Sequence, residues 1–152
     1  IRNIFFQSVR PGDQIMINFG TDEGRDSPNR LRVFHNSAMN QSVKGVFVNN
    51  SIAVPAIVAN NLFFGTSGTL VRGPVEQRFN ELAAVAAVVD TKGMDFRLKE
   101  NSTLIDRGVE VRKRDGIRMY ADAEYRHPMK AEARLKVRTP DIAAYEYCRN
   151  RL

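Results

Sequence analysis

Four basic side chains in the first half of the chain have the chemistry needed to handle an acidic sugar: Arg32, His35, Lys44 and Arg72. Elimination from a uronide requires a base, together with a cation that neutralises the sugar carboxylate. His35 follows an apolar strand-like run, and we expect it to face outward. The four residues form a candidate polyanion groove, although solvated charge on the outside of strands is the alternative.

Acidic residues offer a weaker candidate. Asp22, Glu23 and Asp26 form a tight acidic group within the wholly polar segment 21–30. Glycoside hydrolysis needs two carboxylates held roughly 5–10 Å apart, and a polar loop holds such a pair poorly. The same residues could bind Ca²⁺, but their spacing fits no EF-hand loop. Ca²⁺ remains a possible ligand, and no other cofactor is expected.

The remaining reactive residues suggest no catalytic centre. His127 lies in an Arg-His-Pro loop, and Cys148 is the single cysteine, so an internal disulfide is excluded. The spacing of histidine and cysteine matches no transition-metal motif. We expect Cys148 to be a half-buried thiol, and the catalytic residues, if there are any, stay unknown.

The composition is that of a globular domain with a basic surface. The 152 residues carry a formal net charge of +6, which suits a polyanionic partner. Segment 107–115 holds the densest basic run but is interrupted by acidic residues. No apolar run is long enough to span a membrane, and no nucleic-acid-binding motif is present.

Residues 1–75 alternate short apolar runs with polar turns. Each run is rich in β-branched or aromatic residues and is bounded by Gly, Asn, Pro or Ser, which is the pattern of a β-strand. The expected strands lie at 2–6, 14–19, 31–36, 45–50, 56–64 and 69–71.

A repeat runs through these strands. Asn3, Asn36 and Asn61 each precede an apolar trio, at spacings of 33 and 25 residues. A turn of a parallel β-helix takes roughly 20–30 residues, so the first repeat carries an insertion, found at 21–30. Asn tolerates the left-handed conformation at a corner, and its amide can bond the Asn of the next coil. The repeat predicts an Asn ladder, and a β-sandwich without repeats is the alternative.

The second half changes character. Apolar residues between 76 and 89 follow the spacing of one helical face, which predicts a short helix near 76–86 and an extended segment at 87–90. Further strands are expected at 96–98 and 103–105. Segment 107–140 is polar and lacks a long periodic run, so we expect an ordered cover across the side and end of the stacked coils.

Two motifs near the end of the chain carry a family resemblance. Residues 98–108 and 141–147 read LKENSTLIDRG and DIAAYEY. They resemble the closing elements of bacterial right-handed parallel β-helix proteins of the pectate-lyase-like class. The matching cap residues are Asp106, Gly108, Asp141, Tyr145 and Tyr147, and shorter likenesses lie at 115–118 and 125–128 with Arg134. Thr103 and Ala143 depart from the usual Pro and Gly.

The resemblance implies an all-β solenoid with coils over 1–75, and a last coil with a loop-rich cap over 76–152. It also implies a secreted, periplasmic or cell-surface protein that binds or processes acidic polysaccharide, with any lyase centre upstream of this chain. A non-enzymatic structural or adhesive module is the alternative. Because Ile1 begins mid-coil, we expect the rest of a larger β-helix, or another copy, to cover that end.

Overall fold

The computed structural model describes residues 3–9, 14–22, 28–42, 44–65, 68–111, 116–117, 122–126, 130–134 and 139–148. Several sequence predictions fall outside these ranges and are not addressed by the structure. They concern Ile1, Glu23, Asp26, His127 and most of the basic run at 112–115.

The chain is an all-β protein built on three parallel sheets. Four strands form sheet A, and three strands form each of sheets B and C. In sheet order, A holds β1 (Ile4–Gln7), β4 (Ser37–Asn40), β7 (Leu62–Gly65) and β10 (Glu81–Leu82). B holds β2 (Ile15–Phe19), β5 (Gly45–Asn50) and β8 (Gly68–Arg72), and C holds β3 (Arg32–Phe34), β6 (Ala56–Ala59) and β9 (Val75–Arg78).

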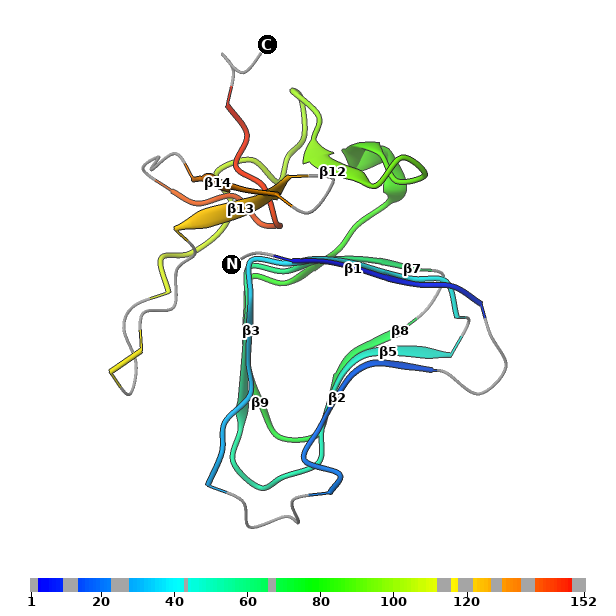
Figure 1. The fold of residues 1–152 in the computed structure, drawn as a ribbon, viewed down its shortest axis with the longest axis vertical. Coiled ribbons are helices and arrows are strands. Elements are labelled where there is room, and N and C mark those ends of the chain that lie inside the picture. Colours follow the sequence, from blue (N-terminus) through cyan, green and yellow to red (C-terminus); the bar gives the residue numbers. More distant parts are fainter. Residues whose placement is uncertain are drawn as a thin grey trace.

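The chain visits the sheets in the fixed order A, B, C and returns to A, and one such circuit is called a coil. Each of the strands β1 to β7 therefore pairs with the strand three positions later. Figure 1 looks down this stack and shows the strands of each sheet superimposed along three sides of one outline. The strands pair in unbroken register, as in the row Phe5, Ala38, Phe63 and Leu82 of sheet A.

Gly73 makes the corner between sheets B and C possible. Its φ of 91° lies in the region that favours glycine, and a Cβ there would overlap the carbonyl oxygen of Asn50 in the coil before. Asn50 supports the same corner, because its side-chain amide donates to the carbonyl of Pro74 at 2.8 Å.

One apolar core fills the space enclosed by the three sheets. It gathers inward-facing residues from all three, namely Val33, Ala38, Phe47, Val48, Ala56, Val58 and Phe63. The rings of Phe47 and Phe63 pack with centroids 4.6 Å apart. Sheet A lies against this core with one face only, so its other face requires a separate cover.

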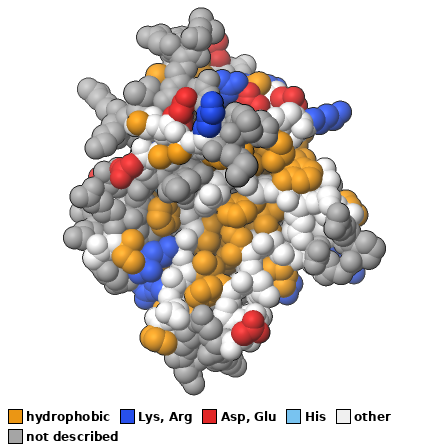
Figure 2. Space-filling model, viewed as in Figure 1, with side chains coloured by type: hydrophobic (Ala, Val, Ile, Leu, Met, Phe, Trp, Pro, Cys, Tyr) orange, Lys and Arg blue, Asp and Glu red, His pale blue; other side chains and the backbone are white. Residues whose placement is uncertain are grey.

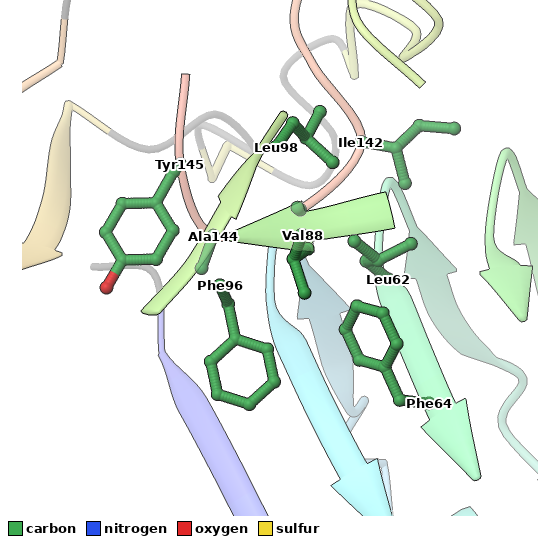
Figure 3. Close-up of a cluster of buried hydrophobic side chains, with 9 residues drawn as sticks. Leu62, Phe64, Val88, Phe96, Leu98, Ile142, Ala144 and Tyr145 are labelled. Atoms are coloured by element: carbon green, nitrogen blue, oxygen red, sulfur yellow. The ribbon is translucent and has the colours of Figure 1, made fainter. Parts of the chain in front are cut away.

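The C-terminal half supplies that cover. It contains two antiparallel strand pairs, β11 (Val88–Asp90) with β12 (Asp95–Leu98) and β13 (Ala123–Arg126) with β14 (Lys130–Ala133). Its apolar side chains pack on the outer face of sheet A, and Figure 3 shows Phe96, Val88 and Tyr145 gathered near Leu62 and Phe64 of β7. The cover therefore lies beside the stack, where Figure 1 also places it.

Several sequence predictions about local structure are wrong. No helix forms over 76–86: the stack continues there through β9 and β10, and a 3₁₀ turn spans Val85–Ala87. This segment forms strands because its backbone pairs with the preceding coil. Asn80 also continues the Asn repeat, since its side chain accepts the N–H of Asn61. Segment 103–105 is a turn rather than a strand, and the run at 56–64 is two strands divided by a corner at Asn60 and Asn61. No helix among the described residues is long and apolar enough to cross a membrane.

Candidate functional site: the buried junction between the strand stack and its cover

A ladder of side-chain amides lines the corner at which each coil enters sheet A. Asn36 donates to the Oδ1 of Asn61 from its Nδ2 at 2.9 Å and from its backbone N–H at 3.0 Å. Asn61 makes the same pair of bonds to Asn80, at 2.9 and 3.1 Å. Asn3 donates to Asn36 at 3.4 and 3.0 Å. The ladder thus contains the three predicted asparagines and a fourth, Asn80, which lies only 19 residues after Asn61.

The left-handed residue at this corner is the one before Asn36, Asn61 and Asn80. His35, Asn60 and Phe79 have φ values of 54°, 56° and 48°. The expectation that the ladder asparagines themselves adopt this conformation is therefore wrong. The preceding residue turns the chain, and the asparagine that follows uses its amide to satisfy backbone groups of the corner, as Asn61 does at the carbonyl of Ala59 (3.0 Å).

Asn60 joins the corner to the cover. Its side chain binds both polar backbone groups of Val109, donating to the carbonyl at 2.7 Å and accepting from the N–H at 2.9 Å. Its own carbonyl accepts the N–H of Ala143 at 3.1 Å. Asn60 is fully buried, so these bonds are shielded from water.

The two closing motifs meet at this junction. The buried carboxylate of Asp141 accepts the backbone N–H of Asp106 at 2.7 Å on one oxygen and the N–H of Tyr147 on the other. Gly108 donates its N–H to the carbonyl of Pro140 at 2.8 Å, which leaves no room for a Cβ. Asp106 adopts a φ of 56°, so the turn that presents its N–H is tight.

Buried charges continue the junction toward His35. Glu146 accepts the N–H of Asp141 at 3.2 Å and pairs with Arg134, and its own N–H donates to Glu124 at 3.1 Å. A guanidinium nitrogen of Arg134 lies 3.5 Å from the Nδ1 of His35, whose Nε2 lies 3.3 Å from the amide nitrogen of Asn60. A buried charge that loses its partner is strongly destabilising. This series of contacts therefore stabilises the packing of the cover on the stack.

The polar side chains of the junction hold the cover against the strand stack. Asp141, Glu146, Glu124 and His35 are each 5% exposed or less, and each binds a backbone group or another side chain. Groups engaged in this way are shielded from a polymeric substrate. Of the predicted cap residues, Asp106, Gly108, Asp141 and Tyr147 are joined to one another or to Pro140 through backbone groups of the junction.

Two ionisable groups of the cover are shifted by their surroundings. Burial raises the pKa of the Tyr145 hydroxyl, with repulsion from Asp95, Tyr125 and Glu124 adding to the shift. The pKa of Asp95 is lowered, chiefly by the hydrogen bonds that Arg97 donates at 2.8 and 2.5 Å. The first shift favours a neutral phenol in the folded cover, and the second reflects an exposed surface pair.

The predicted polyanion groove is not assembled. His35 is only 1% exposed, so the expectation that it faces outward is wrong, because the corner turns its ring under the cover. Arg32 lies in sheet C, whereas Lys44 and Arg72 lie at opposite ends of sheet B. Lys44 precedes the Gly45–Gly68 pair and Arg72 forms the Asn49–Arg72 pair, a separation of roughly 17 Å along the strands.

A different polar row lies on the outside of sheet B. Asn18, Asn49 and Arg72 are consecutive in register, and Asn49 donates to Asn18 at 2.8 Å. Asn18 and Arg72 are exposed. This row was not predicted from the sequence, although its three residues lie at equivalent positions near the ends of three strand runs.

The other candidates contribute no centre. Within the described ranges, no three His, Cys, Asp or Glu side chains are grouped as metal ligands. Asp22 is exposed, and its two acidic neighbours in sequence lie outside those ranges. Cys148 is a free, half-buried thiol, as expected.

Comparison of this chain with protein-family models, with curated proteins and with solved structures finds no match.

Proposed function

We propose that this chain is a module of a right-handed parallel β-helix, closed along one side by its C-terminal cover. Support comes from the repeated A, B, C circuit and from the ladder that marks the same corner in every coil. Parallel strands joined by crossovers are right-handed in about 98% of cases, which favours the proposed hand.

The function that this geometry supports best is non-catalytic binding of an extracytoplasmic acidic polysaccharide. The observation that carries it is the row of Asn18, Asn49 and Arg72, which follows the stack axis on the outside of sheet B and in which Asn18 and Arg72 are exposed. Amides donate to sugar hydroxyls and a guanidinium binds a carboxylate in a bidentate geometry, so the row suits a uronic-acid chain.

Catalysis by these described residues has little support, since the buried ionisable groups bind one another and the cover. A lyase would also need a base beside a cation on an open surface. His35, the candidate base with a pKa nearest neutrality in model compounds, is enclosed.

Affinity electrophoresis of the whole chain in gels that contain polygalacturonate or a neutral glucan tests this proposal. We expect retardation by the acidic polymer alone, and several-fold weaker binding after Arg72→Ala. Lys44→Ala removes the same charge from the other end of sheet B and is the matched control. Equal loss in both variants would reduce the effect to net charge, and unretarded migration would overturn the proposal.

Ultraviolet absorbance during the same incubation tests the non-catalytic part, because lyase products contain an absorbing double bond. A steady rise that depends on the protein would show that the module is an enzyme. We expect a flat trace.

A further inference from the structure

Among the residues that the structure describes, no strand pairs with the outer edge of the first coil or of the last coil. β1, β2 and β3 are edge strands at one end, and β10, β8 and β9 are edge strands at the other. Inward-facing apolar residues of both outer coils are only partly buried, among them Phe5 and Ile17 at the first end and Val71 and Val75 at the last. Figure 2, which looks down the stack, shows apolar side chains across the middle of the end that faces the viewer.

The polar ladder is complementary between the ends. Each ladder asparagine donates its N–H and its Nδ2 to the Oδ1 of the next coil. Asn3, which begins the ladder, accepts no hydrogen bond on its Oδ1 from any residue the structure describes. If Asn80 follows the pattern of Asn36 and Asn61, its backbone N–H is directed away from the preceding coil, toward the outer edge of the last coil. The last asparagine of one molecule therefore offers the donor that the first asparagine of another can accept.

Continuing the register across the gap places matching side chains together. In sheet C the rows run Arg32, Ile57, Glu76 and Phe34, Ala59, Arg78. A further β3 laid on β9 would set Arg32 beside Glu76, an opposite-charge pair, and Phe34 beside Arg78, a cation–π pair.

The inward rows match as well. In sheet A the row from Phe5 ends at Leu82, and in sheet B the row from Ile17 ends at Val71. A second molecule would thus bring Phe5 onto Leu82 and Ile17 onto Val71. Leu82 is 43% exposed, and this contact would remove it from water.

We propose that a second copy of this chain docks head to tail, its first coil stacking on the last coil of the molecule before it. The docking strands are parallel, and they repeat the displacement that relates successive coils within one molecule. A head-to-tail contact does not close on itself, so the assembly grows as an open filament. The described part of the cover lies beside sheet A, away from the strands that would pair with the second copy.

Cysteine cross-linking between two variants tests this arrangement. Arg32→Cys and Glu76→Cys, each combined with Cys148→Ser, are oxidised separately and as a mixture. Neighbouring parallel strands lie about 4.8 Å apart, within the range of about 4.4–6.8 Å between Cα atoms that a disulfide spans. We expect a covalent dimer in the mixture and none in either variant alone. A dimer of one variant alone would show a different contact, and no dimer at all would overturn the proposal.

Reversal of charge provides an independent arm. Sedimentation velocity of the native chain should show a mass that rises with concentration beyond a dimer. Glu76→Arg sets two cations beside each other and should leave monomers, whereas the double variant with Arg32→Glu restores the pair and the growth. Far-UV circular dichroism verifies the fold of each variant. A native chain that stays at 17.2 kDa at every concentration would contradict the proposal.

Discussion

The carboxylate of Asp141 accepts the backbone N–H of Asp106 at 2.7 Å, joining two segments 35 residues apart in the chain. Its second oxygen accepts the N–H of Tyr147. One buried, acceptor-only group thus joins the turn that follows β12 to the C-terminal segment that packs on sheet A. A carboxylate suits this position because it accepts at both oxygens and donates at neither.

Replacement of Asp141 by Asn should loosen the cover. The amide accepts at one atom only, so either the N–H of Asp106 or that of Tyr147 faces an NH₂ group. We expect a loss of about 2–3 kcal/mol in the free energy of unfolding, measured by urea denaturation. Asp122→Asn is the control at an exposed position of the cover. Equal stability of the two variants would contradict a role for the Asp141 carboxylate.

The ladder should depend most on its central member. Asn61 is fully buried and bonds to Asn36, Asn80 and the carbonyls of Val33 and Ala59. Asn61→Ala leaves several of these groups unpaired, and we expect a loss of about 2–4 kcal/mol in unfolding free energy. Asn18→Ala removes an exposed amide from the outer row, and we expect it to lower the unfolding free energy by only about 0.5 kcal/mol. A ladder loss as small as that would show that water replaces the amide.

Ala143 stores backbone strain that glycine would relieve. Its φ of 125° is unfavourable for a residue with a Cβ, at roughly 1–3 kcal/mol. Glycine loses about 0.5–1 kcal/mol through chain entropy and about 0.8 kcal/mol through the missing methyl group. We expect Ala143→Gly to keep or raise the melting temperature.

Ala144→Gly isolates that strain. Ala144 is equally buried in the same segment but is not among the residues with positive φ. Ala144→Gly has the same losses of chain entropy and of a methyl group, but it relieves no backbone strain. It should therefore be less stable than Ala143→Gly by about 1 kcal/mol or more. Identical melting curves for the two variants would show that the Ala143 backbone is unstrained.

Tyr145 should make the cover sensitive to alkali. Its pKa is raised in the folded state above the ordinary value of 10.0, mainly by burial. The folded protein then holds this proton more tightly than the unfolded chain does. Its contribution to stability is complete below pH 10 and declines as the pH rises from there toward the folded pKa. The decline approaches about 1.4 kcal/mol per pH unit for a single proton.

Urea denaturation of the native chain and of Tyr145→Phe between pH 8 and 11 measures this contribution. The native chain should lose more stability across the upper part of this range, because phenylalanine carries no proton. Tyr147→Phe, at a half-buried neighbour, is the control. Parallel pH profiles for native protein and Tyr145→Phe would exclude titration of Tyr145 as the cause.

The sequence by itself determined the parts of this protein that depend on local pattern. Period-two apolar runs between polar turns predict the strands of the first two coils, since each strand has one face toward a core. The recurrence of Asn3, Asn36 and Asn61 identifies the ladder, because equivalent residues of stacked coils lie one above another.

Tertiary structure alone decided the rest. The apolar spacing of 76–89 suits a helix in isolation, but pairing of Val75 with Ala56 and of Glu81 with Leu62 draws the segment into strands. The burial of His35 follows from a cover that reaches it with Arg134, 99 residues later. Such contacts leave no local pattern, because their energy arises only when distant segments exclude water together.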